Sequence, residues 1–248
     1  MSAEPASEAI WNQVECGGYT ADLPLWEQLA AENEGPIVEL GCGVGRVVEH
    51  LSRASGSLVI GVDRDRELVE EVWRRLHGRP GNSGDAEIGD VRGFELYARF
   101  QLALAPMQLV QLLPGRVDRI CCLACVSDHL LAGGRAAFAI VEEMPTLAAE
   151  EAAPALPDVR QVGDWVYSSL PLAPEVDEER IVLRRLRQTV DPEGKMSEEL
   201  NEVELLRLSA ERLEQEATEV GLQPLARRQI PATETHIGST VVLLEKEA

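Results

Sequence analysis

The feature that most constrains this sequence is a glycine-rich stretch that follows a short apolar run. Residues 37–40 form the apolar run, and residues 41–46 read GCGVGR. Gly41 and Gly43 let the chain turn tightly and approach a ligand without interference from a Cβ, and Gly45 lets the helix that follows lie close to the sheet. A strand that runs into such a turn and then into a helix directs backbone N–H groups and the positive end of the helix dipole to one point. The stretch therefore predicts a nucleotide-type binding site.

Apolar runs and helical patterns alternate on both sides of this stretch, which predicts right-handed βαβ crossovers and a doubly wound α/β fold. The helical patterns cover residues 4–15, a segment that begins after Asp22 and stops at Gly35-Pro36, and residues 44–53, 66–77 and 116–131. The runs that read as buried parallel strands cover residues 37–40, 58–62, 86–89, 102–105 and 136–141. A closing pair at residues 225–230 and 237–244 completes a mostly parallel seven-stranded sheet whose last strand is antiparallel.

The alternation breaks after the fifth strand. Residues 144–208 contain three extended segments, at residues 159–170, 180–190 and 196–208, joined by turns rich in proline and glycine. We interpret this region as an antiparallel β insertion that acts as a lid or a dimerisation surface. Ser209 then caps a helix that ends at Gly221. The predicted organisation is an N-terminal helical segment at residues 1–35 that closes over the cofactor, a core at residues 36–143 and 209–248, and the insertion at residues 144–208.

An acidic residue at the end of the second strand supports a nucleotide site. Asp63 lies 18 residues beyond Gly45, where it can accept hydrogen bonds from both ribose hydroxyls of an adenosine. Nicotinamide dinucleotide folds use the same geometry. Their G-x-G-x-x-G pattern, started at Gly41, would need a small residue where this chain has Arg46. The spacing therefore disfavours a nicotinamide cofactor.

The string from Glu39 to Gly45, E-x-G-x-G-x-G, resembles motif I of class I S-adenosylmethionine-dependent methyltransferases. The resemblance covers residues 36–141 and the closing strand pair, and the insertion resembles the antiparallel lid of several small-molecule methyltransferases. It implies that S-adenosylmethionine is the cofactor and S-adenosylhomocysteine the product, with Glu39 near the methionine part and Asp90 at the adenine amino group. Many relatives carry Asp where this chain has Gln101. The cofactor-binding residues expected from loop position and resemblance are Tyr19, Glu39, Gly41, Cys42, Gly43, Gly45, Arg46, Asp63, Arg64, Asp90, Val91, Ala105 and Pro106.

Loops that follow strands mark the face where the acceptor should bind. Residues 105–108 follow the fourth strand and lack the Asn- or Asp-Pro-Pro-aromatic motif that is typical of nucleic-acid and protein-glutamine methyltransferases, so those substrates are not expected. We expect Met107, Gln108, Gln111 and Glu142 to contact the substrate. For Gln111, a cap on exposed helix surface is an equal alternative, and Glu142 could instead belong to a solvated rim.

His236 is the preferred general base because it lies in the connection between the last two strands, on the active face, and imidazole titrates near neutral pH. A surface histidine in a polar turn is the alternative. Tyr19 could close the cofactor pocket or serve only in packing. His129 ends the helix that enters the fifth strand, on the opposite face, and is expected to interact with the helix dipole.

Charge and cysteine content narrow the partners and the compartment. The net charge of -20 repels phosphate backbones, so nucleic acids and anionic membranes are not expected partners. Five cysteines, an odd number in a large chain, and a start without signal-peptide character favour the cytoplasm. The cluster Cys121-Cys122 and Cys125 has no partner motif to complete a metal site, so no metal is expected. The arginines at positions 184, 185 and 187 are expected to pair across strands with Glu198, Glu199, Glu202 and Glu204.

The leading hypothesis is an enzyme that transfers a methyl group from S-adenosylmethionine to nitrogen or oxygen of a small molecule. A non-catalytic S-adenosylmethionine-binding sensor or partner-binding protein is the alternative, because both need the same cofactor site. A nicotinamide-dependent oxidoreductase is a third possibility that Arg46 disfavours. The exposed strands expected in the insertion are natural dimer edges, so a homodimer is possible.

Overall fold

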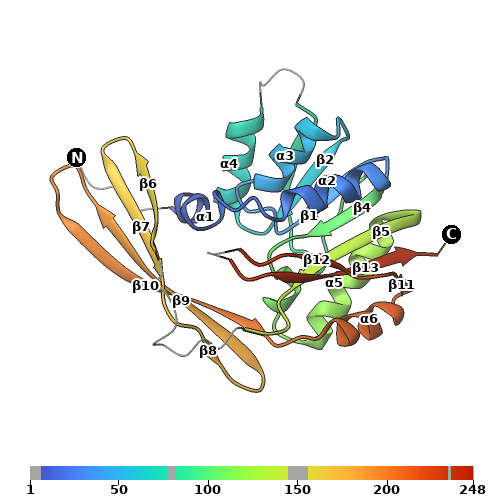
Figure 1. The fold of residues 1–248 in the computed structure, drawn as a ribbon. Coiled ribbons are helices and arrows are strands. Elements are labelled where there is room, and N and C mark those ends of the chain that lie inside the picture. The colour runs from blue at the N-terminus through green and yellow to red at the C-terminus, as the bar shows by residue number, and fades with distance from the viewer. Residues whose placement is uncertain (1–6, 78–81, 145–155, 234–235, 248) are drawn as a thin grey trace.

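A computed structural model describes residues 7–77, 82–144, 156–233 and 236–247. The helix predicted at residues 4–15 begins outside these ranges, because residues 4–6 are not among those described. The chain forms two sheets, a large mixed sheet in the core and a separate antiparallel sheet beside it (Figure 1). No helix of the described residues is long and apolar enough to cross a membrane.

The core sheet has the strand order β11-β13-β5-β4-β1-β2-β3. The strands β1 to β5 run parallel to one another, and β13 is antiparallel to β5. The mostly parallel sheet with an antiparallel last strand, predicted from the sequence, is confirmed, but it has eight strands and not seven, because β12 (Arg228–Ile230) also pairs with β13. Its other strands are β1 (Ile37–Leu40), β2 (Val59–Asp63), β3 (Gly84–Ile88), β4 (Phe100–Ala105), β5 (Leu130–Ile140), β11 (Leu222–Pro224) and β13 (Ser239–Lys246).

Helices cover both faces of this sheet (Figure 1). One face packs under α2 (Leu23–Glu32), α3 (Arg46–Ala54) and α4 (Arg66–Leu76), and the other under α5 (Arg116–His129) and α6 (Ala210–Thr218). Two apolar clusters fill the two interfaces, one around Trp26, Leu51 and Val72 and the other around Phe138, Leu123 and Leu213. Burial of these side chains on both sides explains why the central strands read as continuous apolar runs.

The insertion is an antiparallel sheet, as expected, but with one more hairpin than the sequence suggested. Its order is β10-β9-β7-β6, and β8 pairs with β9. The segment predicted as one strand at residues 159–170 is a hairpin, because Gly163 adopts a positive φ of 60° and reverses the chain between Val162 and Trp165. The strands are β6 (Asp158–Val162), β7 (Trp165–Pro171), β8 (Glu175–Val176), β9 (Arg180–Val190) and β10 (Met196–Leu206).

Residues 89–99, between β3 and β4, contain no helix, and none is predicted there from the sequence. Two further elements differ from the sequence prediction. Of the strand predicted at residues 225–230, only β12 (Arg228–Ile230) forms. A separate strand, β11, precedes the predicted range, and the two pair with successive parts of β13 in registers that differ by one residue. β5 begins directly after α5, six residues earlier than predicted, and its pairing with β4 is irregular across Phe100 and Leu102.

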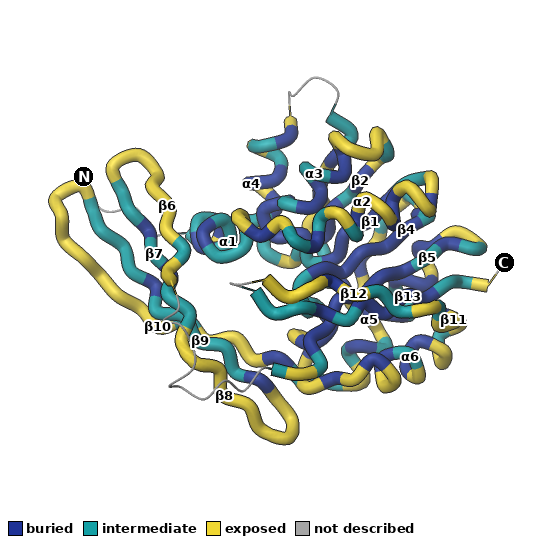
Figure 2. Tube along the Cα trace, in the orientation of Figure 1, coloured by how far each residue is buried: buried dark blue, intermediate teal, exposed yellow. Residues whose placement is uncertain are grey.

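The short helix α1 (Glu8–Cys16) lies between the insertion sheet and the core, where it contacts β7, β6 and α4 (Figure 1). Burial follows this arrangement. The strands β4 and β5 are buried along most of their length, whereas β10 is largely exposed and β7 and β9 are mostly half-buried (Figure 2). The insertion is therefore attached to the rest of the molecule partly through α1.

Candidate functional site

The glycine-rich loop turns sharply between β1 and α3. All three of its glycines have positive φ, 63° at Gly41, 55° at Gly43 and 79° at Gly45, a region in which a Cβ is strained. Space is restricted as well, because a Cβ at Gly43 would lie 2.9 Å from the side chain of Asn12, and one at Gly45 would lie 3.0 Å from Val72 on α4. The loop thus needs glycine at these positions, as the sequence indicated.

Asp63 fixes this loop from the end of the neighbouring strand. Its Oδ2 accepts a hydrogen bond of 2.9 Å from the Gly43 N–H, and its Oδ1 accepts one of 2.9 Å from the Asp65 N–H. The carboxylate is half-buried beside the loop. Each carboxylate oxygen can accept more than one hydrogen bond, so Asp63 can hold the loop and still accept from vicinal hydroxyl groups of a ligand.

Glu39 lies under the same loop, near the end of β1. The residue is 3% exposed, and its Oε2 has no hydrogen-bond partner among the described residues. Burial raises the pKa of Glu39 to about 8, against the opposing effects of the Arg46 charge and a hydrogen bond with the Val48 backbone in the first turn of α3. A buried acceptor without a partner, directly beneath a glycine loop, fits a site for a cationic ligand group.

Arg46, expected to bind the cofactor, directs its guanidinium to the N-terminal segment. It pairs in a fork with Asp22, at 2.7 Å and 2.6 Å, and donates to the Tyr19 carbonyl at 2.8 Å. Asp22 is 1% exposed and also accepts a hydrogen bond from Trp26 Nε1. Arg46 therefore anchors residues 19–22 to the loop, and Asp22 serves this ion pair without capping α2 through its side chain.

Tyr19 and His236 are brought together although they are 217 positions apart. Their rings stack with centroids 4.5 Å apart, and the Arg46 guanidinium lies 5.2 Å from the centre of the Tyr19 ring. Burial lowers the pKa of His236 from its ordinary value, while Asp158 and Arg185 of the insertion act on it with opposite signs. The stack joins the N-terminal segment, the C-terminal connection and the insertion at one place.

Two of the expected cofactor-binding residues, Asp90 and Val91, lie in the loop after β3, whereas Arg64 follows β2. Asp90 accepts hydrogen bonds from Arg92 Nε, Nη2 and the Arg92 backbone, and these contacts lower its pKa to about 2. Two bonds close a turn in this loop: the Asp90 carbonyl accepts from Gly93 N–H, and the Asp90 carboxylate accepts from Arg92 N–H. Val91 is buried and Arg64 is exposed. Recognition of a base by Asp90 would have to share its carboxylate with Arg92.

The loop after β4 carries the strongest backbone strain outside glycine. Met107 and Gln108 have φ values of 55° and 64°, and they are the only described residues other than glycine with positive φ. Ala105 and Pro106 before them are buried. Gln108 Nε2 donates to Ser239 Oγ at 3.2 Å, which directs this side chain to the start of β13, near the His236 connection. Strain of this kind concentrates at functional loops.

Two residues expected to contact substrate have structural roles. Gln111 is completely buried, and its amide exchanges hydrogen bonds with Val141 N–H and C=O and donates to the Leu206 carbonyl. These hydrogen bonds connect the end of β5 with the end of the insertion, so the Gln111 amide has a structural role. Glu142 Oε1 accepts from Ala210 N–H at the start of α6. The thiol of Cys42 likewise packs against Gly61 on β2, which leaves only its backbone for a ligand.

Sequence reasoning missed the groups that α1 and the insertion bring to the site. Asn12 Oδ1 accepts from the Val44 N–H at 3.3 Å, so α1 touches the glycine loop. Arg184 pairs with Glu202 across strands, as predicted. Arg187 instead pairs in a fork with Glu15 on α1, and Arg185 pairs with Asp158 and Ser169. Side chains alternate between the faces of a strand, so both turn toward α1; no local sequence pattern announces such contacts.

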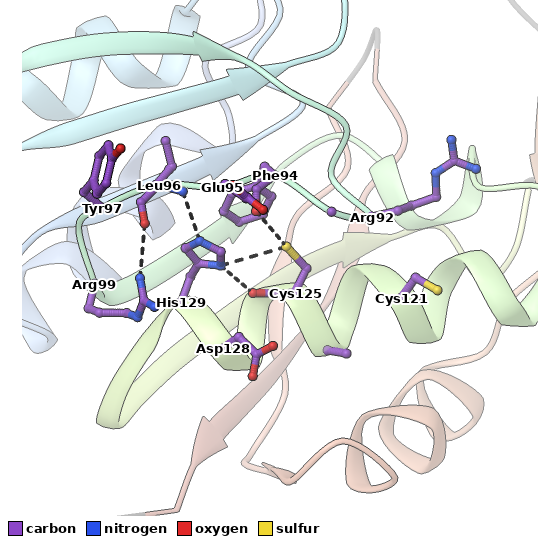
Figure 3. A pocket seen from close by; sticks show the side chains of 12 residues that line it. Arg92, Phe94, Glu95, Leu96, Tyr97, Arg99, Cys121, Cys125, Asp128 and His129 are labelled. Carbon is purple, nitrogen blue, oxygen red and sulfur yellow. Dashed lines mark hydrogen bonds between the residues drawn. The ribbon is translucent and has the colours of Figure 1, made fainter.

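A separate surface hollow of about 740 Å³ lies between α5 and the loop after β3 (Figure 3). His129 borders it, with Nε2 accepting from Leu96 N–H and Nδ1 bonded to the Cys125 carbonyl. A ring fixed in this way holds the loop through Nε2, and its Nδ1 contact with the Cys125 carbonyl in the last turn of α5 agrees with the interaction expected at the end of this helix. Cys121 and Cys125 line the hollow, but the described residues contain no cluster that could hold a metal ion.

No protein-family model and no curated protein sequence matches the chain. Solved structures do. The sugar N-methyltransferase KedS8 from Streptoalloteichus sp superposes with a TM-score of 0.77 at 12% identity, covering 100% of this chain and 96% of that chain. An S-adenosylmethionine-dependent methyltransferase from Clostridium acetobutylicum gives 0.70 at 15% identity, with coverages of 97% and 98%. CalS10, an amino pentose methyltransferase from Micromonospora echinaspora with bound S-adenosylmethionine, gives 0.69 at 15% identity, with coverages of 99% and 100%.

The chain has the fold of these methyltransferases. The match spans nearly the whole length on both sides, so it includes the antiparallel insertion as well as the core sheet. At this level of identity the likeness establishes the fold, and the chemistry rests on the residues of the site.

Proposed function

We propose that this protein is a methyltransferase that transfers a methyl group from S-adenosylmethionine to an amine of a small molecule. The observation that carries the proposal is the glycine loop with its two acids. Asp63 accepts a hydrogen bond from the Gly43 N–H of this loop, and the buried Glu39 beside it has a carboxyl oxygen without a partner. Such a site combines acceptors for a ribose with a buried acid for a cation. The similar folds of KedS8 and CalS10, which are described as a sugar N-methyltransferase and an amino pentose methyltransferase, support this proposal.

On the donor side, the bound cofactor would supply an electrophilic methyl group on a sulfonium sulfur. The loop glycines would admit its methionine part, with Glu39 below, and Asp63 would accept from the ribose hydroxyls. Asp90, Val91, Arg64, Ala105 and Pro106 border the region where the adenine would lie. Tyr19 would close the pocket, held in place by Arg46.

On the acceptor side, the stacked rings of Tyr19 and His236 and the Gln108 amide at Ser239 would border the substrate. A protonated amine cannot attack a methyl group until it loses a proton. Because burial lowers the pKa of His236, this ring is neutral at physiological pH and can take that proton. Alignment of the nucleophile and exclusion of water by the insertion and α1 would supply most of the remaining acceleration.

The test is release of S-adenosylhomocysteine from S-adenosylmethionine with a panel of amino sugars, small amines and phenols. We expect turnover with amines, and loss of turnover in Asp63→Ala. Turnover restricted to phenols would replace the amine by an oxygen acceptor. Tight binding of S-adenosylmethionine without turnover of any acceptor would contradict the enzyme proposal and favour a non-catalytic sensor.

We also propose a cytoplasmic homodimer that binds neither nucleic acid nor membrane. The face of the insertion sheet turned away from α1 carries two apolar rows, Val166-Val190-Met196 and Leu170-Leu186-Leu200, in which Met196 and Leu200 are 55% and 59% exposed. Face-to-face packing with a second copy would cover both rows, and the net charge of -20 repels polyanions. Light scattering should give twice the chain mass for the wild type, and a monomer for Leu200→Glu. A monomeric wild type would refute the dimer.

A further inference from the structure

Glu39 is the most deeply buried acid of the candidate site that has an oxygen without a partner. It is the third residue of β1, it is 3% exposed, and its carboxyl group lies against the first turn of α3 through the Val48 backbone. The other buried acids in the described part of the chain are paired. Asp22 has Arg46 and Trp26, Glu71 has Gln13 and Arg74, and Glu216 has Arg119 and Arg212.

The charged groups that face Glu39 leave it without a counter-ion of its own. They are Arg46 from α3, Asp22 from the start of α2 and Asp63 from the end of β2, with the buried Cys42 thiol beside them. The only cation in this set, Arg46, is already neutralised by its fork with Asp22. An ionised Glu39 would therefore add a second uncompensated negative charge next to Asp63. Burial outweighs the attraction to Arg46 and raises the pKa of Glu39 to about 8, so that the free protein keeps this carboxyl group mostly protonated at pH 7.

A ligand with a net positive charge above the glycine loop would change this balance. S-adenosylmethionine has a sulfonium and an ammonium group against one carboxylate, whereas the sulfur of S-adenosylhomocysteine is neutral. We propose that Glu39 senses the charge of the methyl donor: it is protonated in the free protein, ionises when the cationic donor binds, and releases that proton to the solvent. The proposal rests on the proposed function, because it needs S-adenosylmethionine at this loop.

The coupling distinguishes substrate from product at one residue. Binding of the cation and ionisation of Glu39 favour each other by thermodynamic linkage. Loss of the sulfonium charge after transfer removes the counter-ion, so Glu39 takes up a proton again. The affinity of the protein for the product is then lower than its affinity for the donor. The structure thus assigns to Glu39 a preference for donor over product that contacts to the shared adenosine part cannot supply.

Calorimetry in two buffers with different ionisation enthalpies measures the protons released on binding. For the wild type at pH 7 we expect about one proton per S-adenosylmethionine and clearly fewer per S-adenosylhomocysteine. The Kd for S-adenosylmethionine should fall by about tenfold between pH 6 and pH 7 and level off above pH 8. The ligand's own α-amino group titrates with a pKa near about 7.7–8.0, so the relevant quantity is the difference between the wild type and Glu39→Gln.

Glu39→Gln keeps an acceptor for the Val48 backbone but cannot ionise, so it should lose the proton release and the steep part of the pH dependence. Glu70→Gln removes an exposed carboxylate on α4 and should behave as the wild type. An infrared difference spectrum of the wild type supplies a measurement that needs no variant: addition of S-adenosylmethionine should bleach the carbonyl band of a protonated carboxylic acid.

The outcomes separate the two proposals. Equal proton release in the wild type and in Glu39→Gln, or an unchanged infrared carbonyl band, overturns the role of Glu39 and leaves the methyltransferase proposal standing. Absence of S-adenosylmethionine binding to the wild type contradicts the methyltransferase proposal, and the role of Glu39 falls with it.

Discussion

At the scale of single residues, the site depends on a stack of three side chains from distant parts of the chain. The Arg46 guanidinium covers one ring, Tyr19, which in turn stacks on the imidazole of His236. Arg46 also holds the Tyr19 backbone and the buried Asp22. Arg46 is thus a positioning residue: it fixes the segment against which the candidate base packs, and it acts on the reaction through that segment.

Replacement of Arg46 by lysine tests this positioning role. Lysine cannot make the two-pronged pair with Asp22, so we expect a loss of about 2 kcal/mol in the free energy of unfolding and a fall in Tm of about 4–8 °C. The kcat should fall much more than the affinity for S-adenosylmethionine. Arg53→Lys, at an exposed pair with Glu49 on the same helix, is the matched control, and equal behaviour of the two variants would contradict the role.

His236 gives a pH prediction of defined sign. Because its pKa is lowered in the folded protein, the neutral, proton-accepting form persists as pH falls below about 6.5. With saturating S-adenosylmethionine, kcat for an amine should hold at pH 6.5 and decline only as pH falls through the lowered pKa. His236→Asn should reduce kcat by about 10²–10⁴ fold, while His77→Asn, at an exposed pair with Asp85, should not. A wild-type pH profile retained in His236→Asn would eliminate this base.

At the scale of elements, α1 connects the donor loop with the insertion. Asn12 meets the glycine loop, while Trp11 packs edge-on against Tyr167 of β7 and lies under the Arg187 guanidinium. Glu15 binds Arg187 in a fork and accepts from Ser169. A helix of nine residues is too short to be stable alone, so these contacts hold it in place, and displacement of α1 would affect both sides of the site.

The two glutamates of α1 that reach Arg187 form a matched pair for testing this connection. The Glu15 side chain is 13% exposed and that of Glu8 is 59% exposed. Glu15→Gln should cost roughly 2–3 kcal/mol because Arg187 is buried, and it should speed proteolysis within the insertion and lower kcat/KM. Glu8→Gln should cost less than about 1 kcal/mol. Equal effects of the two changes in thermal unfolding would show that the connection does not depend on the buried pair.

Elements were predictable where a pattern was long and uninterrupted. β9 and most of β10 were predicted to the residue from alternation, and the Ser209 cap marked the start of α6 through a hydrogen bond to Arg212 N–H. The hairpin between β6 and β7 was missed because a single glycine, Gly163, reverses the chain within one apolar stretch. The crossover at residues 89–99 has no helix, and Phe94 in it packs against the His129 ring.

At the scale of the whole molecule, the sheet order brings the loops after β1, β2, β3 and β4 to one edge, where open α/β sheets bind ligands. This rule let the sequence indicate the glycine loop, Asp63 and the loop after β4. It could not indicate Asn12, Asp22 or Arg185, because their place depends on how α1 and the insertion pack against the core. Gln111, expected to contact the substrate, lies at this edge, but its amide is hydrogen-bonded to the Val141 backbone.

The central claim is that the glycine loop binds a methyl donor and not a dinucleotide, and direct titration of the protein with S-adenosylmethionine and with NADH tests it. We predict that S-adenosylmethionine binds with one site per chain, that Asp63→Ala abolishes this binding while Asp65→Ala retains it, and that NADH produces no binding heat. Tight binding of NADH without binding of S-adenosylmethionine would contradict the account.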